Sequence, residues 1–275
     1  MVIKQVNACS LIIRASYIFF YIYSCPLWGS FFKSDTITSW FKATNEERLA
    51  QEYPLASQAI VELHGLQGDI TVKAWNKKKI MVEAIKYGSS AACSNTHISI
   101  TPENNHITIT SSYVDKLGPT AYINYTVLVP QRCNLRLYNG KGNTTIYDIH
   151  GTIFSQTERG DTNVHDATES VTVKNSQGSI HLDQKKFTDE DSIFLETGKG
   201  SIYLSIHRSI NANLHAKTRL GTVTSEIPIT TFSQTVKLNK ETWNNWKRSV
   251  KGALGQGGAP ITIDVTKGNI VIKEY

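Results

Sequence analysis

The chain has 275 residues, of which 40% are apolar and 19% are charged, with 18 glycines and 7 prolines. This composition excludes a disordered or collagen-like chain and supplies enough apolar material for a sizeable hydrophobic core. The net charge of +6 permits an acidic partner, although lysines on an ordinary solvated surface explain it equally well.

Residues 1–29 are typical of an export signal or a membrane anchor. Lys4 and Arg14 precede an apolar run at residues 17–23, which has the length of a signal-peptide core and is short for a transmembrane span. The run is followed by Ser24 and Cys25, in a sequence similar to a bacterial lipobox. A cleaved signal, lipid attachment at Cys25 and an uncleaved anchor are all compatible with this segment. Each of them predicts an exported protein of the cell envelope.

Residues 30–54 are predicted to form a linker with one short helix. The sequence from Thr44 to Glu47 fits a capping box, which would open a helix through Gln51, and Pro54 would end it. Strand patterns follow at residues 59–63, 69–74, 79–86, 97–101, 106–110 and 121–129. The polar residues 102–105 favour a hairpin turn between two of these strands. No helix longer than a turn or two is expected between residues 55 and 130.

Two alternating strands separated by a glycine turn form a unit that recurs along the chain. The unit is clearest at residues 171–182 and returns at residues 60–72, 135–146, 153–164, 193–204, 214–223 and 261–272. The glycines that close its turns are Gly68, Gly142, Gly160, Gly178, Gly200, Gly221 and Gly268. A period of about twenty residues with one glycine per unit is typical of a solenoid.

Elementary geometry explains this unit. Glycine reaches backbone conformations in which other residues clash, so it permits the sharp turn. The short polar residue after each glycine is expected to bond its own backbone within the turn. Strand alternation predicts that Val171, Val173, Ile180 and Leu182 point inward. Since one unit cannot bury its face alone, successive units must stack. The sequence therefore predicts an all-β fold, a single-stranded β-solenoid or β-helix-like stack over residues 55–275. The early strands and the closing strand would be its caps.

An insertion at residues 228–260 interrupts the repeat. Trp243, Trp246 and Val250 have helical spacing and lie among basic residues. This pattern predicts a short amphipathic helix, which either packs its tryptophans on the solenoid or touches a membrane or partner. Residues 252–258 would be a flexible return. In the body of the chain, Cys93 and Cys133 either form a disulfide or stay as buried thiols.

Several short motifs, taken in order, make residues 55–275 resemble the bacterial putative-adhesin family, a domain of unknown function. They are Gly68-Asp-Ile-Thr-Val72, Val127-Leu-Val-Pro130, the Gly-Ser-Ile sequences at Gly178 and Gly200, Gly252-Ala-Leu-Gly255, and the alternating segment 261–272. The resemblance implies a β-solenoid body, an association with the cell envelope and no catalytic activity. Leu220 and the tryptophan-bearing insertion depart from the pattern.

Motifs for chemistry are not found. The sequence has no nucleophile elbow, zinc-protease helix, phosphate loop or calcium loop. No cofactor, metal or nucleic-acid partner is therefore predicted. Because parallel β-helices include carbohydrate-active enzymes, the acidic residues Asp183, Asp189, Glu190 and Asp191 form an alternative candidate site. Three of them are consecutive and would point in different directions, which favours a solvated loop.

The residue before each closing glycine forms the candidate contact site. These residues are Gln67, Lys141, Arg159, Gln177, Lys199, Leu220 and Lys267. Stacking would place them on one edge, where the four cations could meet an anionic envelope polymer, a membrane surface or a host-cell surface. Charge at turns also blocks aggregation between edges, which is the simpler explanation.

Three functions are compatible with these patterns. The leading hypothesis is a non-enzymatic envelope β-solenoid, an adhesin or surface-interaction module that uses Lys141, Arg159, Lys199, Lys267, Trp243 and Trp246. The alternatives are a scaffold that self-associates end to end and a carbohydrate-active β-helix enzyme. The sequence does not identify the ligand.

Overall fold

The structure of the chain is a computed structural model, which describes residues 45–55, 58–231 and 248–275. The chain divides into two compact units, Met1–Phe41 and Lys42–Tyr275, and all described residues belong to the second. The export segment 1–29, including Cys25, lies outside the described residues. Among the helices that are described, none is long and apolar enough to cross a membrane.

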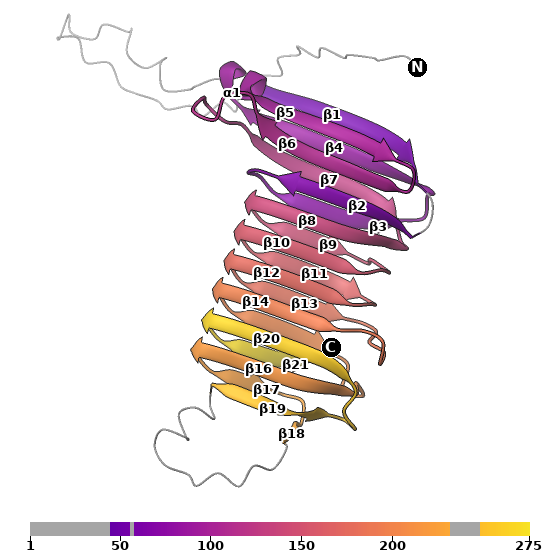
Figure 1. Cartoon of the computed structure of the whole chain (residues 1–275), viewed down its shortest axis with the longest axis vertical. Coiled ribbons are helices and arrows are strands. Elements are labelled where there is room, and N and C mark those ends of the chain that lie inside the picture. Colours follow the sequence, from indigo (N-terminus) through magenta and orange to yellow (C-terminus); the bar gives the residue numbers. More distant parts are fainter. Residues whose placement is uncertain (1–44, 56–57, 232–247) are drawn as a thin grey trace, which may run out of the picture. The chain divides into compact units, whose positions relative to one another are not determined.

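The described chain is nearly all β and forms two large sheets, which confirms the predicted fold class at this level (Figure 1). Sheet A contains, in spatial order, β1 (Asn45–Pro54), β4 (Lys79–Gly88), β7 (Tyr122–Pro130), β3 (Ile70–Trp75), β9 (Thr144–Tyr147), β11 (Thr162–Ala167), β13 (Ile180–Gln184), β15 (Ile202–Ile206), β21 (Ile270–Glu274) and β17 (Val223–Ser225). Sheet B contains β18 (Thr230–Thr231), β19 (Ser249–Leu254), β16 (Ala212–Leu220), β20 (Ala259–Lys267), β14 (Ile193–Lys199), β12 (Val171–Gln177), β10 (Ile153–Arg159), β8 (Cys133–Lys141), β2 (Ala59–Gly65), β6 (His106–Tyr113) and β5 (Thr96–Glu103). The short helix α1 (Ser90–Asn95) joins β4 to β5.

Each predicted repeat contributes one strand to each sheet. Its first strand lies in sheet B, the chain turns at the glycine, and the second strand lies in sheet A. Strands of neighbouring repeats pair in parallel, so that Ile153 lies beside Val171 and Val171 beside Ile193. Val171, Val173, Ile180 and Leu182 are fully buried, as the alternation predicts, and the inward side chains of both sheets form one hydrophobic cluster. Sharing this core is what makes stacking favourable, because a single repeat would leave its apolar face in water.

The repeats are not stacked in chain order throughout. Strand β20 pairs with β14 on one side and with β16 on the other, and β21 pairs with both β15 and β17. The repeat at 259–274 therefore lies between the repeats at 193–206 and 212–225 (Figure 1). The expectation that the closing strand is a cap is wrong, since both edges of β20 and β21 are paired. At this end of sheet B, the antiparallel strands β19 and β18 complete the sheet instead.

The helix predicted from residue 44 to residue 51 is also wrong. Residues 45–54 form β1, which pairs antiparallel with β4 along its whole length, from Asn45 beside Gly88 to Pro54 beside Lys79. Leu49 and Tyr53, four residues apart and so on the same face of the strand, pack against the core. Ten paired positions and this packing outweigh a local capping signal, because helix propensity is a weak preference. Residues 45–54 therefore belong to the folded body rather than to a linker.

Candidate functional site

The closing glycines lie in a row, which we call the glycine edge. The N–H of each glycine donates to the carbonyl of the residue before the next glycine, as from Gly142 to Arg159 (2.9 Å) and from Gly160 to Gln177 (2.9 Å). The φ of Gly160 is 139°, and an added Cβ would overlap the carbonyl oxygen of Gly142. Gly221 differs, because its φ is not in the left-handed region, but there too a Cβ would overlap a carbonyl oxygen, that of Gly268. The positive φ and the lack of space for a Cβ are thus two independent reasons why most of these turns need glycine.

The polar residue after each glycine links neighbouring repeats. The backbone N–H of Asn143 donates to Asp69 Oδ1 (2.8 Å), that of Asp161 to Asn143 Oδ1 (3.0 Å), and that of Ser179 to Asp161 Oδ1 (2.7 Å). The expectation of a bond within each residue's own turn is therefore wrong for these positions. Parallel pairing explains the difference, since it places equivalent residues of adjacent repeats about 4.8 Å apart.

A buried polar column behind the glycine edge was missed by sequence reasoning. Its members are Asn139, Thr157, Asn175, Thr197 and Thr218, each three residues before a closing glycine. Asn175 shows their role: its Nδ2 donates to the carbonyls of Gly160 and Ser179 (both 3.2 Å), and its Oδ1 accepts from Thr162 (2.9 Å). Asn or Thr at five of the seven equivalent positions was the available signal. The column satisfies buried backbone carbonyls and so fixes the turns.

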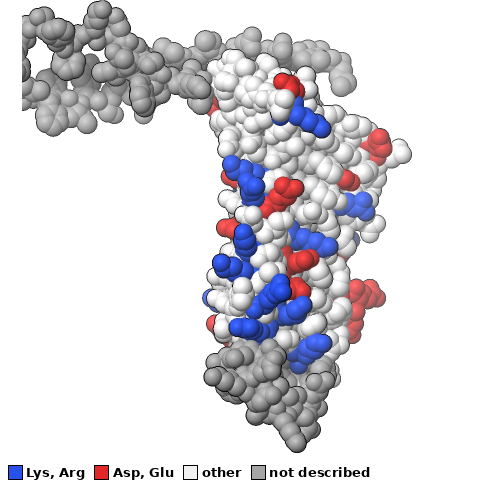
Figure 2. Space-filling model, turned by 60° about the vertical axis from the view of Figure 1, so that its left-hand side comes forward, with Lys and Arg blue, Asp and Glu red and all other residues white. Residues whose placement is uncertain are grey.

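Six of the seven residues predicted before the closing glycines form a row at this edge. The seventh, Gln67, is half-buried and donates to the Thr120 hydroxyl (2.8 Å) and the Ala121 carbonyl (3.1 Å). Lys141 pairs with Arg159, Arg159 with Gln177, Gln177 with Lys199, Lys199 with Lys267, and Lys267 with Leu220. All six side chains are exposed. The sequence order differs from the spatial order in one respect, because the insertion of β20 places Lys267 beside Lys199. Figure 2 shows basic side chains gathered over this face of the molecule.

The cations of this row are largely free. Lys141 Nζ donates to the Tyr122 hydroxyl (3.4 Å) and lies over its ring. Within the described residues, Arg159, Lys199 and Lys267 have no ion-pair partner. The arrangement therefore offers several uncompensated positive charges on a backbone held by hydrogen bonds on both sides.

The predicted insertion is only partly described. Trp243 and Trp246 lie outside the described residues. Ser249 and Val250 belong to strand β19, so the predicted helix does not extend through Val250. Gly252 is buried in the same strand, where its backbone pairs with Leu214, and is not part of a flexible return. Pairing with β16 thus determines the structure of a segment that looked irregular in sequence.

The acidic residues of the alternative enzyme site have separate partners. Asp191 Oδ2 accepts from the backbone N–H and the hydroxyl of Thr188 (both 2.7 Å), which closes a turn. Asp183 pairs with His165 (2.8 Å), which in turn stacks on Tyr147. Asp189 and Glu190 are exposed. These contacts give Asp183 and Asp191 local structural roles.

The two cysteines lie in different clusters. Cys93, on α1, is buried with Ala92 and Ala121, whereas Cys133 belongs to the main core. Both are free thiols, so the disulfide alternative is wrong and the buried-thiol alternative holds. Burial raises the pKa of both thiols, that of Cys133 to about 12.

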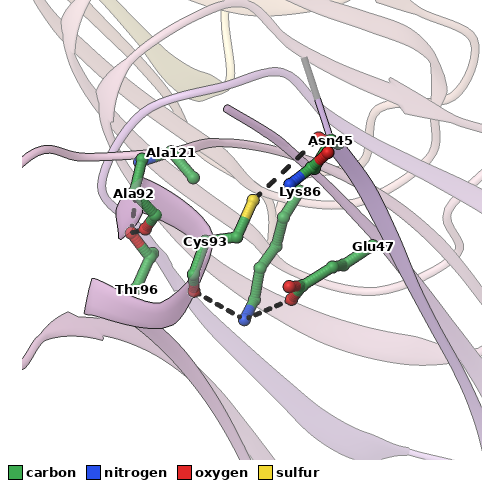
Figure 3. Close-up of polar contacts among 7 residues, drawn as sticks. All are labelled: Asn45, Glu47, Lys86, Ala92, Cys93, Thr96 and Ala121. Carbon is green, nitrogen blue, oxygen red and sulfur yellow. Dashed lines mark hydrogen bonds and ion pairs between the residues drawn. The ribbon is translucent and has the colours of Figure 1, made fainter. Parts of the chain in front are cut away.

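The surroundings of Cys93 tie the helix to sheet A (Figure 3). Lys86 Nζ donates to the Cys93 carbonyl (3.2 Å) and to the Glu47 carboxylate (3.3 Å). The hydroxyl of Thr96 donates to the Ala92 carbonyl (2.9 Å) and accepts from the N–H of Ala121. Glu47 lies on β1 and Lys86 on β4, so these contacts join the helix to two strands of sheet A. Since burial also raises the pKa of the Cys93 thiol, its surroundings are those of a structural cysteine rather than a reactive one.

Two shallow hollows lie at the opposite edge, where the sheet B strands begin. The larger, of about 690 Å³, is bordered by residues that include Arg132, His150, Glu169 and Lys186. The smaller, of about 430 Å³, lies between Lys185 and Asn211. Among the described residues, no group of three or more His, Cys, Asp or Glu side chains is arranged to hold a metal ion.

Glu62, on the outer face of sheet B, contacts two histidines. Its carboxylate lies 2.7 Å from His64 Nε2 and 3.4 Å from His106 Nε2, and His64 stacks on Tyr138. The hydrogen bond from His64 lowers the pKa of Glu62, and the charges of His64, His106 and Arg136 add to this effect against the opposing effect of burial. The charged form is therefore favoured in the folded state.

We expect Glu62→Gln to make the free energy of unfolding less dependent on pH. Because folding lowers the pKa of Glu62, its contribution is present above the unfolded pKa, about 4.3, and is lost as the pH falls through the folded value. Denaturant unfolding from about pH 6 to pH 3 should give a shallower loss of stability for the variant than for the native chain. Glu158→Gln, at an exposed position, is the control and should follow the native curve. Parallel curves for all three proteins would contradict the assignment.

Comparison with known proteins gives structural likenesses only. No family model matches the chain, and no curated protein matches it. A protein of Clostridium sporogenes described as a putative cell adhesion protein is 10% identical, with 84% of this chain and 100% of that chain covered, at a TM-score of 0.48. A putative adhesin of Bacteroides fragilis is 12% identical over 83% and 97%, with a TM-score of 0.29. A putative lipid binding protein of Parabacteroides distasonis is 8% identical over 83% and 96%, with a TM-score of 0.25. At TM-scores below 0.5, these likenesses assign neither a family nor a function.

Proposed function

We propose that the chain is a non-enzymatic β-solenoid, exported to the cell envelope, that binds anionic surfaces through its glycine edge. The observation that carries the proposal is the exposed row containing Lys141, Arg159, Lys199 and Lys267 on paired strands. An adhesin-type or other surface-interaction role follows from this chemistry. The separate structural partners of Asp183 and Asp191 support a non-catalytic role.

The spacing of the row favours joint action. Neighbouring parallel strands lie about 4.8 Å apart, which is shorter than the screening length of roughly 8 Å at physiological salt. Charges on adjacent repeats therefore contribute to one positive field. A single exposed ion contact is worth roughly 0–1 kcal/mol, so binding needs several such contacts and should be sensitive to salt. The turns are held by backbone bonds and by the polar column, which lowers the cost of ordering them.

End-to-end assembly has weaker support. Strand β1, at one edge of sheet A, carries the exposed charged residues Glu46, Glu47, Arg48 and Glu52. Charged edge strands are a common means of preventing strand pairing between molecules.

The proposal is tested by binding to a charged polymer surface. The full chain is passed over immobilised dextran sulfate, with uncharged dextran as the reference, at increasing salt. We expect binding that falls steeply with salt and weakens at least about ten-fold when Lys141, Arg159, Lys199 and Lys267 are all changed to Gln. A control variant carries Gln at Lys78, Arg132, Lys185 and Lys186, four exposed cations away from the glycine edge. Equal binding by the two variants would refute the proposal, because the loss of affinity would then follow from the lower net charge alone and not from the position of the cations.

A further inference from the structure

The positive charge of the glycine edge continues onto the outer face of sheet B at one corner. We call this region the basic corner, and it consists of Lys199, Lys217, Arg219, Arg248, Lys251 and Lys267. Lys199 and Lys267 are neighbours at the turns. Lys217 pairs with Ser249, and the next residue, Thr218, donates its N–H to the Arg248 carbonyl (2.7 Å). The six cations therefore come from four adjacent strands or their ends, β14, β20, β16 and β19.

Negative charge at this corner is small. Glu196 and Asp264 are the acidic residues on the same strands, and only Asp264 makes an ion pair there, with Lys217 at 3.3 Å. For the part of the chain that is described, the other five cations have no carboxylate partner. The pKa of His215 is lowered at this corner. Burial is the largest cause, the charges of Lys251 and Lys217 lower the pKa further, and the smaller effect of Asp264 opposes them. Among the described residues, six cations with two carboxylates give this corner an excess of positive charge.

The insertion of the last repeat creates the corner. Lys267 reaches Lys199 because β20 lies between β14 and β16. Strand β19 then adds Lys251 beside His215 on the far side of β16. Segments that are 50 or more residues apart in sequence thus supply one surface, as with Lys199 and Lys251. Figure 2 shows this concentration of basic side chains towards the lower part of the described surface.

The geometry points to a flexible, linear polyanion as the ligand of the basic corner. All six cations are exposed, and both hollows lie at the opposite edge, so a small anion would meet only screened charges. The cations also occupy two surfaces, since Lys199 and Lys267 lie at the turns while Lys217 and Lys251 lie on the sheet. A flat bilayer meets one of these surfaces at a time, whereas a polymer chain can bend over both. Among the described residues of the corner, Leu220 is the one large exposed apolar side chain, which is little for insertion into lipid.

This inference rests on the proposed function and makes it more specific, because it names the class of ligand and the part of the edge that binds. It predicts that charges at the turns and on the sheet face act together. Lys141 and Arg159 belong to the same row but lie two or more strands from β14. They should therefore contribute little to the binding of a polymer held at the corner.

The test compares three double variants of the full chain, each lacking two positive charges. They are Lys199→Gln with Lys267→Gln, Lys217→Gln with Lys251→Gln, and Lys141→Gln with Arg159→Gln. The probe is long-chain polyphosphate, with affinity measured over a range of salt. We expect the first two variants to lose about ten-fold in affinity and the slope of log affinity against log salt to fall by roughly one for each contacting cation removed. The third should stay close to the native protein. Circular dichroism and thermal unfolding verify that all variants fold.

Two further probes define the ligand class. Inorganic phosphate, at equal total phosphate, should compete poorly, and phosphatidylglycerol vesicles should bind more weakly than polyphosphate. Tighter binding to the vesicles, or equal losses in all three double variants, would overturn the assignment of a polymer site at the corner. Dextran sulfate binding that still depends on the whole row would in that case leave the proposed function standing. If dextran sulfate binding did not depend on the cations of the row at all, both the polymer site at the corner and the proposed function would be refuted.

Discussion

Gly160→Ala is expected to lower the free energy of unfolding by about 3–5 kcal/mol, a large effect for the addition of one methyl group. Gly160 has a φ of 139°, which is costly for any residue with a Cβ. The new Cβ would also overlap the carbonyl oxygen of Gly142, in the neighbouring turn. Relief would require the two repeats to separate, and that would break the bonds that join them at the edge.

Denaturant unfolding followed by circular dichroism measures this loss. Ser176→Ala is the matched control. Ser176 is exposed, and it precedes Gln177, whose carbonyl accepts from the N–H of Gly160. Among the described residues, its side chain makes no hydrogen bond. It should change stability by no more than about 0.5 kcal/mol. A Gly160→Ala variant as stable as this control would show that the turn can rearrange without cost.

Removal of residues 259–275 should unfold one end of the body and leave the rest folded. The deletion removes five fully buried side chains, Ile261, Ile263, Val265, Ile270 and Ile272. At about 1.5–3 kcal/mol for each, the lost burial is roughly 10 kcal/mol. It also removes the parallel partner of β16 and, among the described strands, the one that pairs with β17. The segments at 212–225 and 249–254 then have neither core nor sheet partner on that side.

Amide hydrogen exchange followed by mass spectrometry resolves the effect. Protection should disappear from β16, β17 and β19 and persist in β8 through β13, because each repeat contacts mainly its neighbours. Deletion of residues 1–54 is the control, since it removes edge strand β1 and should alter protection mainly in β4. Retained protection in β16 would contradict the prediction by showing that β16 can pair directly with β14.

The repeat unit could be predicted from sequence because its signals are local. Alternation, a glycine turn and a period of about twenty residues lie within each unit, and the pairing of Lys141 with Arg159 follows from stacking consecutive units. The position of the last repeat could not be predicted in this way. Its strands have the same alternation as all the others, so nothing in the pattern says which units lie beside it. The pairing of Lys199 with Lys267 therefore required the structure.

Other parts of the site depended on long-range contacts. The sequence from Thr44 to Gln51 fits a capped helix, but residues 45–54 pair with β4. Val250 has helical spacing with two tryptophans, but it lies in β19. Tertiary pairing outweighs local preference in both cases. The polar column, by contrast, was visible in principle. Asn139 and Asn175 occupy the same position in their repeats, and an amide at an inward position indicates a buried hydrogen-bond partner.

The internal position of the last repeat also sets an order of events in biosynthesis. Residues 259–274 are synthesised after both of the repeats between which they lie. The units at 133–206 can stack progressively as the chain emerges, whereas β16 and β17 gain their final parallel partners only once these later residues are available. In an exported chain this step would follow translocation of the C-terminal segment. In such a chain the basic corner would be complete only after residues 259–274 have crossed the membrane and paired with β16 and β17.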